Sequence, residues 1–166
     1  MRRVVITGGA SGIGAVMAKR FADGGDQVEV IDADGNAVHA FTQETGIRGH
    51  VADVTDADQM DDVFARIDGV DVLLANAGTG GPAAPVEDIT LDDWRACLAV
   101  NLDGAFLSSR WAARNMKVTR QGVVILTSST SGLFGHPERA PYATAKWGII
   151  GLMKTLAMEL GPHGIR

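Results

Sequence analysis

The stretch that decides the fold spans residues 7–14 and reads Thr7-Gly8-Gly9-Ala10-Ser11-Gly12-Ile13-Gly14. It follows the apolar run Arg3–Thr7, which has the composition of a buried strand, and it opens the helix-period segment Ile13–Gly24. Glycines at this spacing let the backbone turn tightly and approach a pyrophosphate, and the helix N-terminus behind the turn favours an anion. The stretch therefore predicts a dinucleotide-binding loop between the first strand and the first helix.

The rest of the chain repeats this alternation of short apolar runs and longer amphipathic segments. Further strands are predicted at Val28–Ile31, Arg48–Val51, Val70–Ala75 and Gly122–Thr127. Further helices are predicted at Gly35–Thr45, Asp56–Ile67, Leu91–Val118 and Pro141–Leu160. Because strands that alternate with helices pair in parallel through right-handed crossovers, the predicted fold class is α/β, a doubly wound parallel sheet.

Two predicted helix starts carry capping signals. We expect the hydroxyls of Thr55 and Thr90 to accept a hydrogen bond from a free backbone N–H there. The acidic residues that follow each threonine suit the positive end of the helix dipole. Because no histidine or cysteine joins the acidic run Asp56–Asp62, we interpret it as a solvated helix face and not as a metal site.

The composition is that of one folded domain. With 166 residues, of which 46% are hydrophobic and 21% charged, the chain can bury a core without a metal or a disulfide. The net charge of −5 disfavours nucleic acid and anionic membrane surfaces as partners. The sequence contains no apolar run of roughly 20 residues and no signal peptide at its start. Its single cysteine, Cys97, is expected to be a small buried hydrophobe in a reducing cytoplasm.

Two carboxylates follow predicted strands. Asp32 lies roughly 20 residues beyond the glycine loop, where an acidic side chain accepts hydrogen bonds from an adenosine ribose. A carboxylate there repels a 2′-phosphate, and no Arg or Lys stands in the loop or just after Asp32, so NAD is predicted over NADP. Asp53 is placed to bond an adenine amino group, although a helix-capping or turn role explains it about as well.

The segment Tyr142-Ala143-Thr144-Ala145-Lys146 is a candidate for proton transfer. Side chains four residues apart lie on one face of a helix, so the phenol and the ammonium are neighbours. The positive charge favours the phenolate form, which makes Tyr142, the only tyrosine in the chain, a tunable proton donor and acceptor. Ser129 follows the strand Gly122–Thr127 and is placed to bond a substrate oxygen, although a turn-forming role would explain a serine there alone.

Together these residues resemble the short-chain dehydrogenase/reductase family, and the match runs over essentially the whole sequence. That family combines a T-G-x-x-x-G-x-G loop, an Asn-Ala-Gly turn after the fourth strand, a helix asparagine, a serine and Tyr-x-x-x-Lys. The resemblance implies a Rossmann fold with strand order 3-2-1-4-5 and a chain that ends at the start of strand six. Residues 1–166 are therefore expected to form a single NAD-binding domain that carries the catalytic residues and is incomplete at its C-terminus.

The resemblance also assigns roles to residues of this sequence. Catalytic roles fall on Ser129, Tyr142, Lys146 and Asn101. Tyr142 would transfer the proton, while Lys146 would promote its ionisation and bind the nicotinamide ribose. Ser129 would hold the substrate carbonyl and Asn101 would position a water. Cofactor contacts fall on Thr7, Gly8, Ser11, Gly12, Ile13, Gly14, Asp32, Asp53, Val54, Asn76, Ala77, Gly78, Tyr142 and Lys146. No metal is implied, and the four histidines, His39, His50, His136 and His163, show no metal-ligand spacing.

The substrate pocket is represented by Thr79–Pro85 and Thr130–Pro141. One hypothesis is that Arg139 holds an anionic group of the substrate, and an exposed loop arginine is the simpler alternative. Family members commonly pair their two long helices with a second subunit, so a homo-oligomer is expected, a tetramer or a dimer. Trp94 and Trp111, in the first of these helices, are interpreted as packing or interface residues.

The predicted function is an oxidoreductase that transfers a hydride between NAD(H) and a secondary alcohol or ketone. One alternative is a catalytically inert NAD-binding regulatory or scaffold protein on the same fold. Such a protein would be expected to lack Tyr142 or Lys146, and both are present. Another alternative is an epimerase or a dehydratase, whose glycine spacing tends to be shorter.

Overall fold

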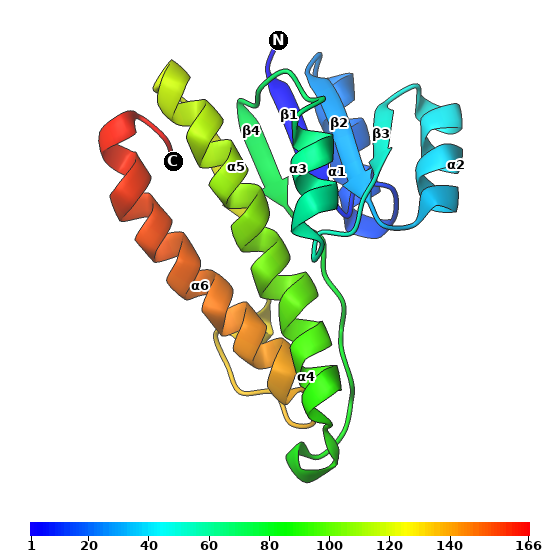
Figure 1. The fold of residues 1–166 in the computed structure, drawn as a ribbon, viewed down its shortest axis with the longest axis vertical. Helices are drawn as coiled ribbons and strands as arrows, with labels where there is room; N and C mark the ends of the chain where they lie inside the picture. The colour runs from blue at the N-terminus through cyan, green and yellow to red at the C-terminus, as the bar shows by residue number, and fades with distance from the viewer.

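A five-stranded parallel sheet runs through the computed structural model, which describes residues 1–166 (Figure 1). Its strands are β1 (Arg3–Thr7), β2 (Gln27–Asp32), β3 (Arg48–Val51), β4 (Val72–Ala75) and β5 (Val123–Leu126). Their order is β3-β2-β1-β4-β5 and every pairing is parallel, which confirms the predicted fold class and strand order. Thr7 lies opposite both Ile31 and Ala75, so the chain leaves β1, β2 and β4 at one common edge.

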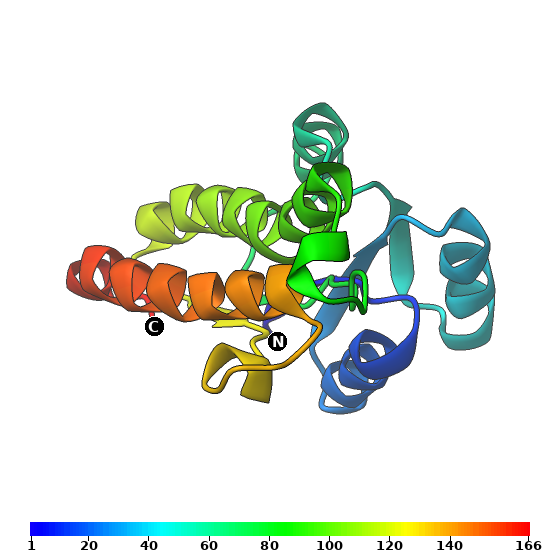
Figure 2. The same cartoon turned by 90° about the horizontal axis from the view of Figure 1, so that it is seen from below.

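Helices cover both faces of this sheet (Figure 2). One face is covered by α1 (Gly12–Asp23) and α2 (Gly35–Thr45), and the other by α3 (Ala57–Phe64), α5 (Gly104–Thr119) and α6 (Ala140–Leu160). Successive side chains of a strand point to opposite faces. Val4 and Ile6 therefore enter the core beneath α1 and α2, while Val5 enters the core beneath α3, α5 and α6. None of these helices combines the length and the apolar character that a membrane span requires.

The long helix predicted over Leu91–Val118 is interrupted near its middle. The structure divides it into α4 (Leu91–Leu98), a π-helical segment η2 (Ala99–Asp103) and α5. The side-chain amide of Asn101 donates to the carbonyl of Cys97 at 2.9 Å, and that carbonyl is the acceptor of the Asn101 backbone N–H in a regular α-helix. The competing bond explains why the backbone widens into a π turn here, a feature frequent at functional sites.

One of the two predicted helix caps is wrong and the other is confirmed. The N-cap of α3 is Asp56, whose carboxylate accepts the N–H groups of Asp58 and Gln59, and not Thr55. Thr55 lies one residue before this N-cap, and its hydroxyl instead donates to Asp53. Thr90 does cap α4, since its hydroxyl accepts the N–H of Asp93 at 3.1 Å.

The edge of β5 that faces away from β4 is bonded to the last residues of the chain. Ile165 forms a parallel bridge with Gly122. The N–H of Val124 donates to the carbonyl of Arg166 at 2.8 Å, and the N–H of Arg166 donates to the carbonyl of Gly122 at 3.0 Å. The last residues of the chain therefore continue the parallel order of the sheet beyond β5.

Cys97, which was predicted to be buried, lies in the interior, and Trp111, which was predicted to be a packing or interface residue, is partly buried against the core. Cys97 is 1% exposed, as expected of a buried thiol without a disulfide partner. Trp111 stacks on Phe64, with the ring centroids 4.1 Å apart and the ring planes within 7° of parallel. The stack joins α5 to α3 and makes Trp111 a packing residue.

The start of β1 is joined to the start of β4 by Arg3 and Asp71. The carboxylate of Asp71 accepts the backbone N–H of Arg3 at 2.7 Å and the Nε of its guanidinium at 3.3 Å. Burial on its own raises the pKa of Asp71, but the hydrogen bonds and the charge of Arg3 outweigh it and hold the pKa below its usual value. A carboxyl group with a lowered pKa stabilises the fold above its unfolded pKa and loses this contribution as the pH falls through the folded value.

We therefore expect Asp71→Asn to lower the free energy of unfolding by about 1 kcal/mol at pH 7. Urea unfolding at pH 7 and below about pH 4 should show that the difference from the unchanged protein shrinks in acid. Asp62→Asn, at an exposed acid of α3, is the control and should change neither value. A difference that stays constant from neutral to acid pH would contradict a role for the ionised carboxylate.

Candidate active site

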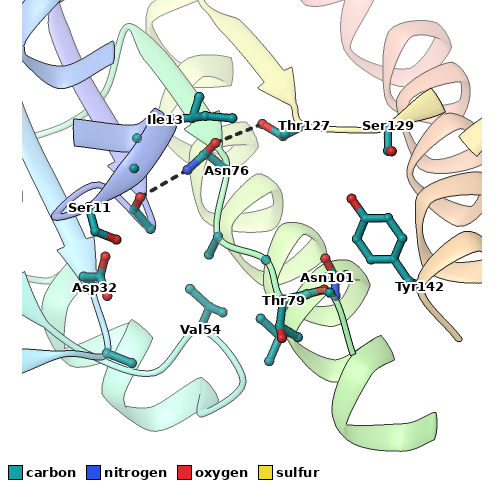
Figure 3. A pocket seen from close by; sticks show the side chains of 18 of the residues that line it. Ser11, Ile13, Asp32, Val54, Asn76, Thr79, Asn101, Thr127, Ser129 and Tyr142 are labelled. Carbon is teal, nitrogen blue, oxygen red and sulfur yellow. Dashed lines mark hydrogen bonds between the residues drawn. The ribbon is translucent and has the colours of Figure 1, made fainter. Parts of the chain in front are cut away.

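A cavity of about 700 Å³ opens at the edge where β1, β2, β4 and β5 end (Figure 3). All but one of the residues predicted to be catalytic or cofactor-binding line it, namely Gly8, Ser11, Gly12, Ile13, Gly14, Asp32, Asp53, Val54, Asn76, Ala77, Gly78, Asn101, Ser129, Tyr142 and Lys146, whereas no residue of the predicted substrate segment Thr130–Pro141 does. The size lies within the range typical of cofactor and small-molecule sites. Ligands of open parallel sheets bind at this edge, so the cavity is the candidate active site.

Some lining residues were not predicted from the sequence. They are Ala33, Ala52, Val100, Thr127 and Ser128, while Thr79 and Gly80 belong to the segment that was predicted for the substrate. Most of the unpredicted residues are chain neighbours of predicted ones at the end of a strand. A position next to a strand end was the signal that could have found them.

The glycine loop has a backbone path that side chains would block. Gly8 has a φ of +62°, a left-handed conformation that favours glycine, and its N–H donates to the carbonyl of Ile31 at 2.8 Å. A Cβ at Gly14 would lie only 1.9 Å from the carbonyl oxygen of Gly8. The close approach of Gly14 to Gly8 brings the start of α1 against the end of β1 and exposes the loop backbone to the cavity.

Thr7 is the predicted cofactor residue that does not line the cavity. It is 2% exposed, and its hydroxyl accepts the N–H groups of Asn76 at 3.1 Å and of Ala77 at 3.2 Å. In return, the Asn76 amide donates to the carbonyls of Thr7 and Gly8. Thr7 and Asn76 thus hold the glycine loop after β1 and the Asn-Ala-Gly turn after β4 in one fixed arrangement.

The two predicted carboxylates are positioned by backbone N–H groups. Asp32 accepts from Ala10 at 3.1 Å and from Asp34 at 3.2 Å, so its carboxylate spans the glycine loop and the start of α2. Asp53 accepts both the N–H and the hydroxyl of Thr55. The turn-forming alternative for Asp53 is therefore observed, and Asp53 lines the cavity at the same time.

Ser129 and Tyr142 bring two hydroxyl groups to the same part of the cavity. Both residues line the cavity, and Figure 3 shows their hydroxyls turned toward one another. The Oγ of Ser129 accepts the N–H of Ser131 at 3.2 Å, which leaves the proton of Ser129 free for donation. Ser131 is held from its other side by His136, whose Nδ1 lies 2.8 Å from the Ser131 hydroxyl.

Lys146 is a buried cation beside the phenol. It is 4% exposed, its Nζ donates to the carbonyl of Thr127 at 2.9 Å, and Nζ lies 5.6 Å from the centroid of the Tyr142 ring. Burial lowers the pKa of Lys146, and no carboxylate lies within ion-pair distance. Because it is the only basic residue lining the cavity, Lys146 makes the end next to Tyr142 positive, whereas Asp32 and Asp53 make the other end negative.

Asn101 leaves a buried acceptor without a partner. It is 1% exposed, and its Nδ2 donates to the carbonyls of Thr79 at 2.8 Å and Cys97 at 2.9 Å, but its Oδ1 accepts no hydrogen bond. A Cβ at Gly78 would lie 2.8 Å from this Oδ1 and 3.5 Å from Nζ of Lys146. An unpaired buried acceptor costs about 1–3 kcal/mol, so this Oδ1 is a polar group that burial leaves without compensation.

Arg139 lies outside the cavity lining. Its Nη1 donates to the carbonyls of Gly80 at 3.1 Å and Gly81 at 3.4 Å. The guanidinium is thus engaged with the loop after β4, and nothing in this arrangement supports a contact with an anionic group of a substrate. The described residues also contain no group of three or more potential metal ligands.

The loop geometry makes a prediction about Gly14. We expect Gly14→Ala to lower the free energy of unfolding by about 1–3 kcal/mol, because its methyl group would overlap the Gly8 carbonyl. Alanine normally favours a helix over glycine, so the matched control is Gly151→Ala in α6, where a Cβ meets nothing within 4 Å. That control should gain about 0.5–1 kcal/mol. Equal effects of the two substitutions in urea unfolding would show that the loop is not tightly packed.

The sequence also matches a known protein family and several of its members. A family model described as short chain dehydrogenase matches residues 2–166. The chain is 38% identical to (+)-borneol dehydrogenase 1 of Salvia officinalis and 32% identical to D-threitol dehydrogenase of Mycolicibacterium smegmatis. Both alignments cover 98% of this chain and 65% of the relative, so the chain spans somewhat less than two thirds of their length.

The same likeness holds among solved structures. The crystal structure of NAD+-bound xylitol dehydrogenase superposes with a TM-score of 0.92 at 33% identity and covers 99% of this chain and 67% of that protein. Levodione reductase superposes with a TM-score of 0.93 at 32% identity, covering 99% of this chain and 68% of that protein.

Proposed function

Because the chain belongs to the short-chain dehydrogenase family, we propose that it is an oxidoreductase that transfers a hydride between NAD(H) and a secondary alcohol or ketone. The observation that carries this proposal is the buried ammonium of Lys146 next to Tyr142, whose hydroxyl shares one part of the cavity with that of Ser129. The buried acceptor of Asn101 and the open path over the glycine loop also fit a bound dinucleotide. The bound cofactor supplies the nicotinamide carbon that accepts or returns the hydride.

In the proposed oxidation of an alcohol, the carbon loses a hydride and the oxygen loses a proton. As the carbinol carbon of the alcohol loses a hydride, its hydroxyl loses a proton to the phenolate of Tyr142 and a carbonyl group forms. Ser129 donates a hydrogen bond to that oxygen, because its own Oγ is already occupied by the N–H of Ser131. Lys146 places the one basic side chain of the cavity beside the phenol ring, 5.6 Å from its centroid. In the reverse direction, Tyr142 returns the proton.

The proton is proposed to leave Tyr142 through Lys146 and a water held by Asn101. The free Oδ1 of Asn101 supports this route, because it is a buried acceptor that still lacks a donor. The Nζ of Lys146 and this Oδ1 both lie beside Gly78. Both side chains are held in place by carbonyls, Thr79 for Asn101 and Thr127 for Lys146, so neither needs to reorganise during turnover.

Several wider features of the protein are also proposals. Residues 1–166 are proposed to be the NAD-binding and catalytic part of one Rossmann domain, consistent with the 65% of each relative that they span. A homo-oligomer through α5 and α6 is supported by the exposed Trp147, Met153 and Met158 of α6. A cytoplasmic location is supported by the lone buried thiol of Cys97.

Replacing the phenol tests the proposed function. Tyr142→Phe should reduce kcat by about 100-fold or more, since proton transfer by a positioned group contributes at least this much. The measurement is NADH formation or loss with a panel of secondary alcohols and ketones, and NADH affinity by fluorescence should fall far less than kcat, because Tyr142 is one of many predicted cofactor contacts. Retained turnover would refute the proton-transfer role of Tyr142. An unchanged protein that binds NADH but acts on no compound of the panel would favour the regulatory alternative.

Replacing the carboxylate of Asp32 tests the preference for NAD. Asp32→Asn keeps the size and one acceptor but removes the charge that repels a 2′-phosphate, so the ratio of NADH to NADPH affinity should fall by about tenfold. Fluorescence titration with both cofactors measures this ratio. Asp23→Ala, at an exposed acid of α1, should leave it unchanged. An unaltered ratio in Asp32→Asn would mean that Asp32 does not select the cofactor.

A further inference from the structure

Arg139 is attached to the loop that forms the cavity wall after β4. It is the last residue before α6 and precedes Tyr142 by less than one helical turn. Its Nη1 bridges the carbonyls of Gly80 and Gly81, and a Cβ at Gly80 would lie 3.2 Å from it. No carboxylate pairs with Arg139 in the structure. The guanidinium of Arg139 therefore donates hydrogen bonds to these two backbone carbonyls and to no other group.

A second bond joins the same two segments. The N–H of Ala84 donates to the carbonyl of Glu138 at 3.1 Å. Glu138 has a φ of +62°, a left-handed conformation that is uncommon for a residue with a side chain. Such a conformation persists only when the surroundings enforce it. The loop 80–84 is therefore held at both ends by residues that immediately precede α6.

The other side of the loop contacts Asn101 and its helix. The carbonyl of Thr79 accepts one of the two bonds of the Asn101 amide. Gly81, with a φ of +63°, lies so close to α4 that a Cβ there would fall 2.6 Å from the Sγ of Cys97. The loop is thus pressed between the start of α6, which carries Tyr142, and the π turn, which carries Asn101.

From this arrangement we infer that Arg139 is a positioning residue, which sets the orientation of the Asn101 amide by holding the Gly80–Gly81 backbone against α6. If the loop moves away, Thr79 no longer accepts from Asn101, and the free Oδ1 loses its fixed direction toward Gly78 and Lys146. Arg139 therefore acts through Asn101 and does not touch the reacting atoms. This inference rests on the proposed function for its effect on turnover, whereas the contact itself does not depend on it.

A planar guanidinium suits this contact better than an ammonium. One of its nitrogens reaches both carbonyls while the rest of the rigid group packs at a half-buried site. A lysine would keep the charge but present a strongly hydrated point donor on a flexible stem. Arg139→Lys thus separates the effect of charge from the effect of the clamp, and Arg139→Met removes both.

Hydrogen exchange tests the clamp without any substrate. In Arg139→Met and Arg139→Lys, backbone amides of residues 79–84 should exchange faster than in the unchanged protein, while those of β1 and β4 should not change. Arg66→Met, at an exposed arginine beyond α3, is the matched control and should leave exchange unaltered. Unchanged exchange of residues 79–84 in Arg139→Met would overturn the inference, as would full protection in Arg139→Lys.

A double-mutant cycle tests the route through Asn101. Arg139→Met alone should lower kcat by about 10- to 100-fold, as misplacement of a catalytic group does, with the affinity for NADH little changed. In an Asn101→Ala background, the same substitution should have almost no further effect on kcat. Purely additive effects would overturn the action through Asn101. If the unchanged protein has no turnover, the proposed function fails, and the exchange experiment still decides whether Arg139 holds the loop.

Discussion

The hydroxyl of Thr7 accepts hydrogen bonds from the N–H groups of Asn76 and Ala77, and the arrangement of the whole site depends on this contact. It joins the ends of two adjacent parallel strands, β1 and β4, at the edge where the backbone leaves the sheet. The reciprocal bonds of the Asn76 amide hold the glycine loop. Thr7 is buried and does not line the cavity, so its effect on a ligand comes entirely from positioning the two loops that do.

The end of the cavity next to Tyr142 keeps polar groups buried at a cost in stability. Lys146 is an ammonium with little exposure and a single carbonyl partner, and Asn101 has an acceptor with none. A sequence selected only for stability would avoid both groups, since each loses hydration without full compensation. Their position fits the proposed proton transfer at Tyr142, because an oriented charge and an oriented acceptor need no rearrangement in such a step. The π turn at Asn101 is a further departure from regular structure at the same place, because the Asn101 side chain takes the carbonyl of Cys97 that a regular helix would use.

Much of the fold could be predicted from the sequence because the strands of a parallel sheet are continuous apolar runs. The strand Arg3–Thr7 and the helix Gly35–Thr45 were predicted with the bounds that the structure has. The π segment was not predicted, because the hydrophobic period on either side of Asn101 is that of one uninterrupted helix. The cap of α3 was misplaced by one residue, since Thr55 and Asp56 are both good capping residues and the choice depends on the bond between Thr55 and Asp53.

In the site too, local sequence patterns were predictive, and contacts between distant segments were not. Residues that belong to short motifs, such as Gly8, Gly12 and Gly14 of the glycine loop and Tyr142 with Lys146, were predicted and line one cavity. Residues whose roles depend on segments far apart in the chain were not understood. Arg139 illustrates this, since its partners, Gly80 and Gly81, lie 59 and 58 residues away and no local pattern indicates the contact. The interior role of Thr7 likewise becomes visible only when β1 and β4 are side by side.

In the proposed reaction, a hydride passes directly between a nicotinamide and the carbon of an alcohol or ketone within this cavity. Mass spectrometry of the product formed from a ketone and NADH deuterated at the transferring position tests this transfer. We predict that the alcohol gains one deuterium at its carbinol carbon and that the label comes from one face of the nicotinamide only. Alcohol formed without deuterium from either face, in protein that binds NADH, would contradict it.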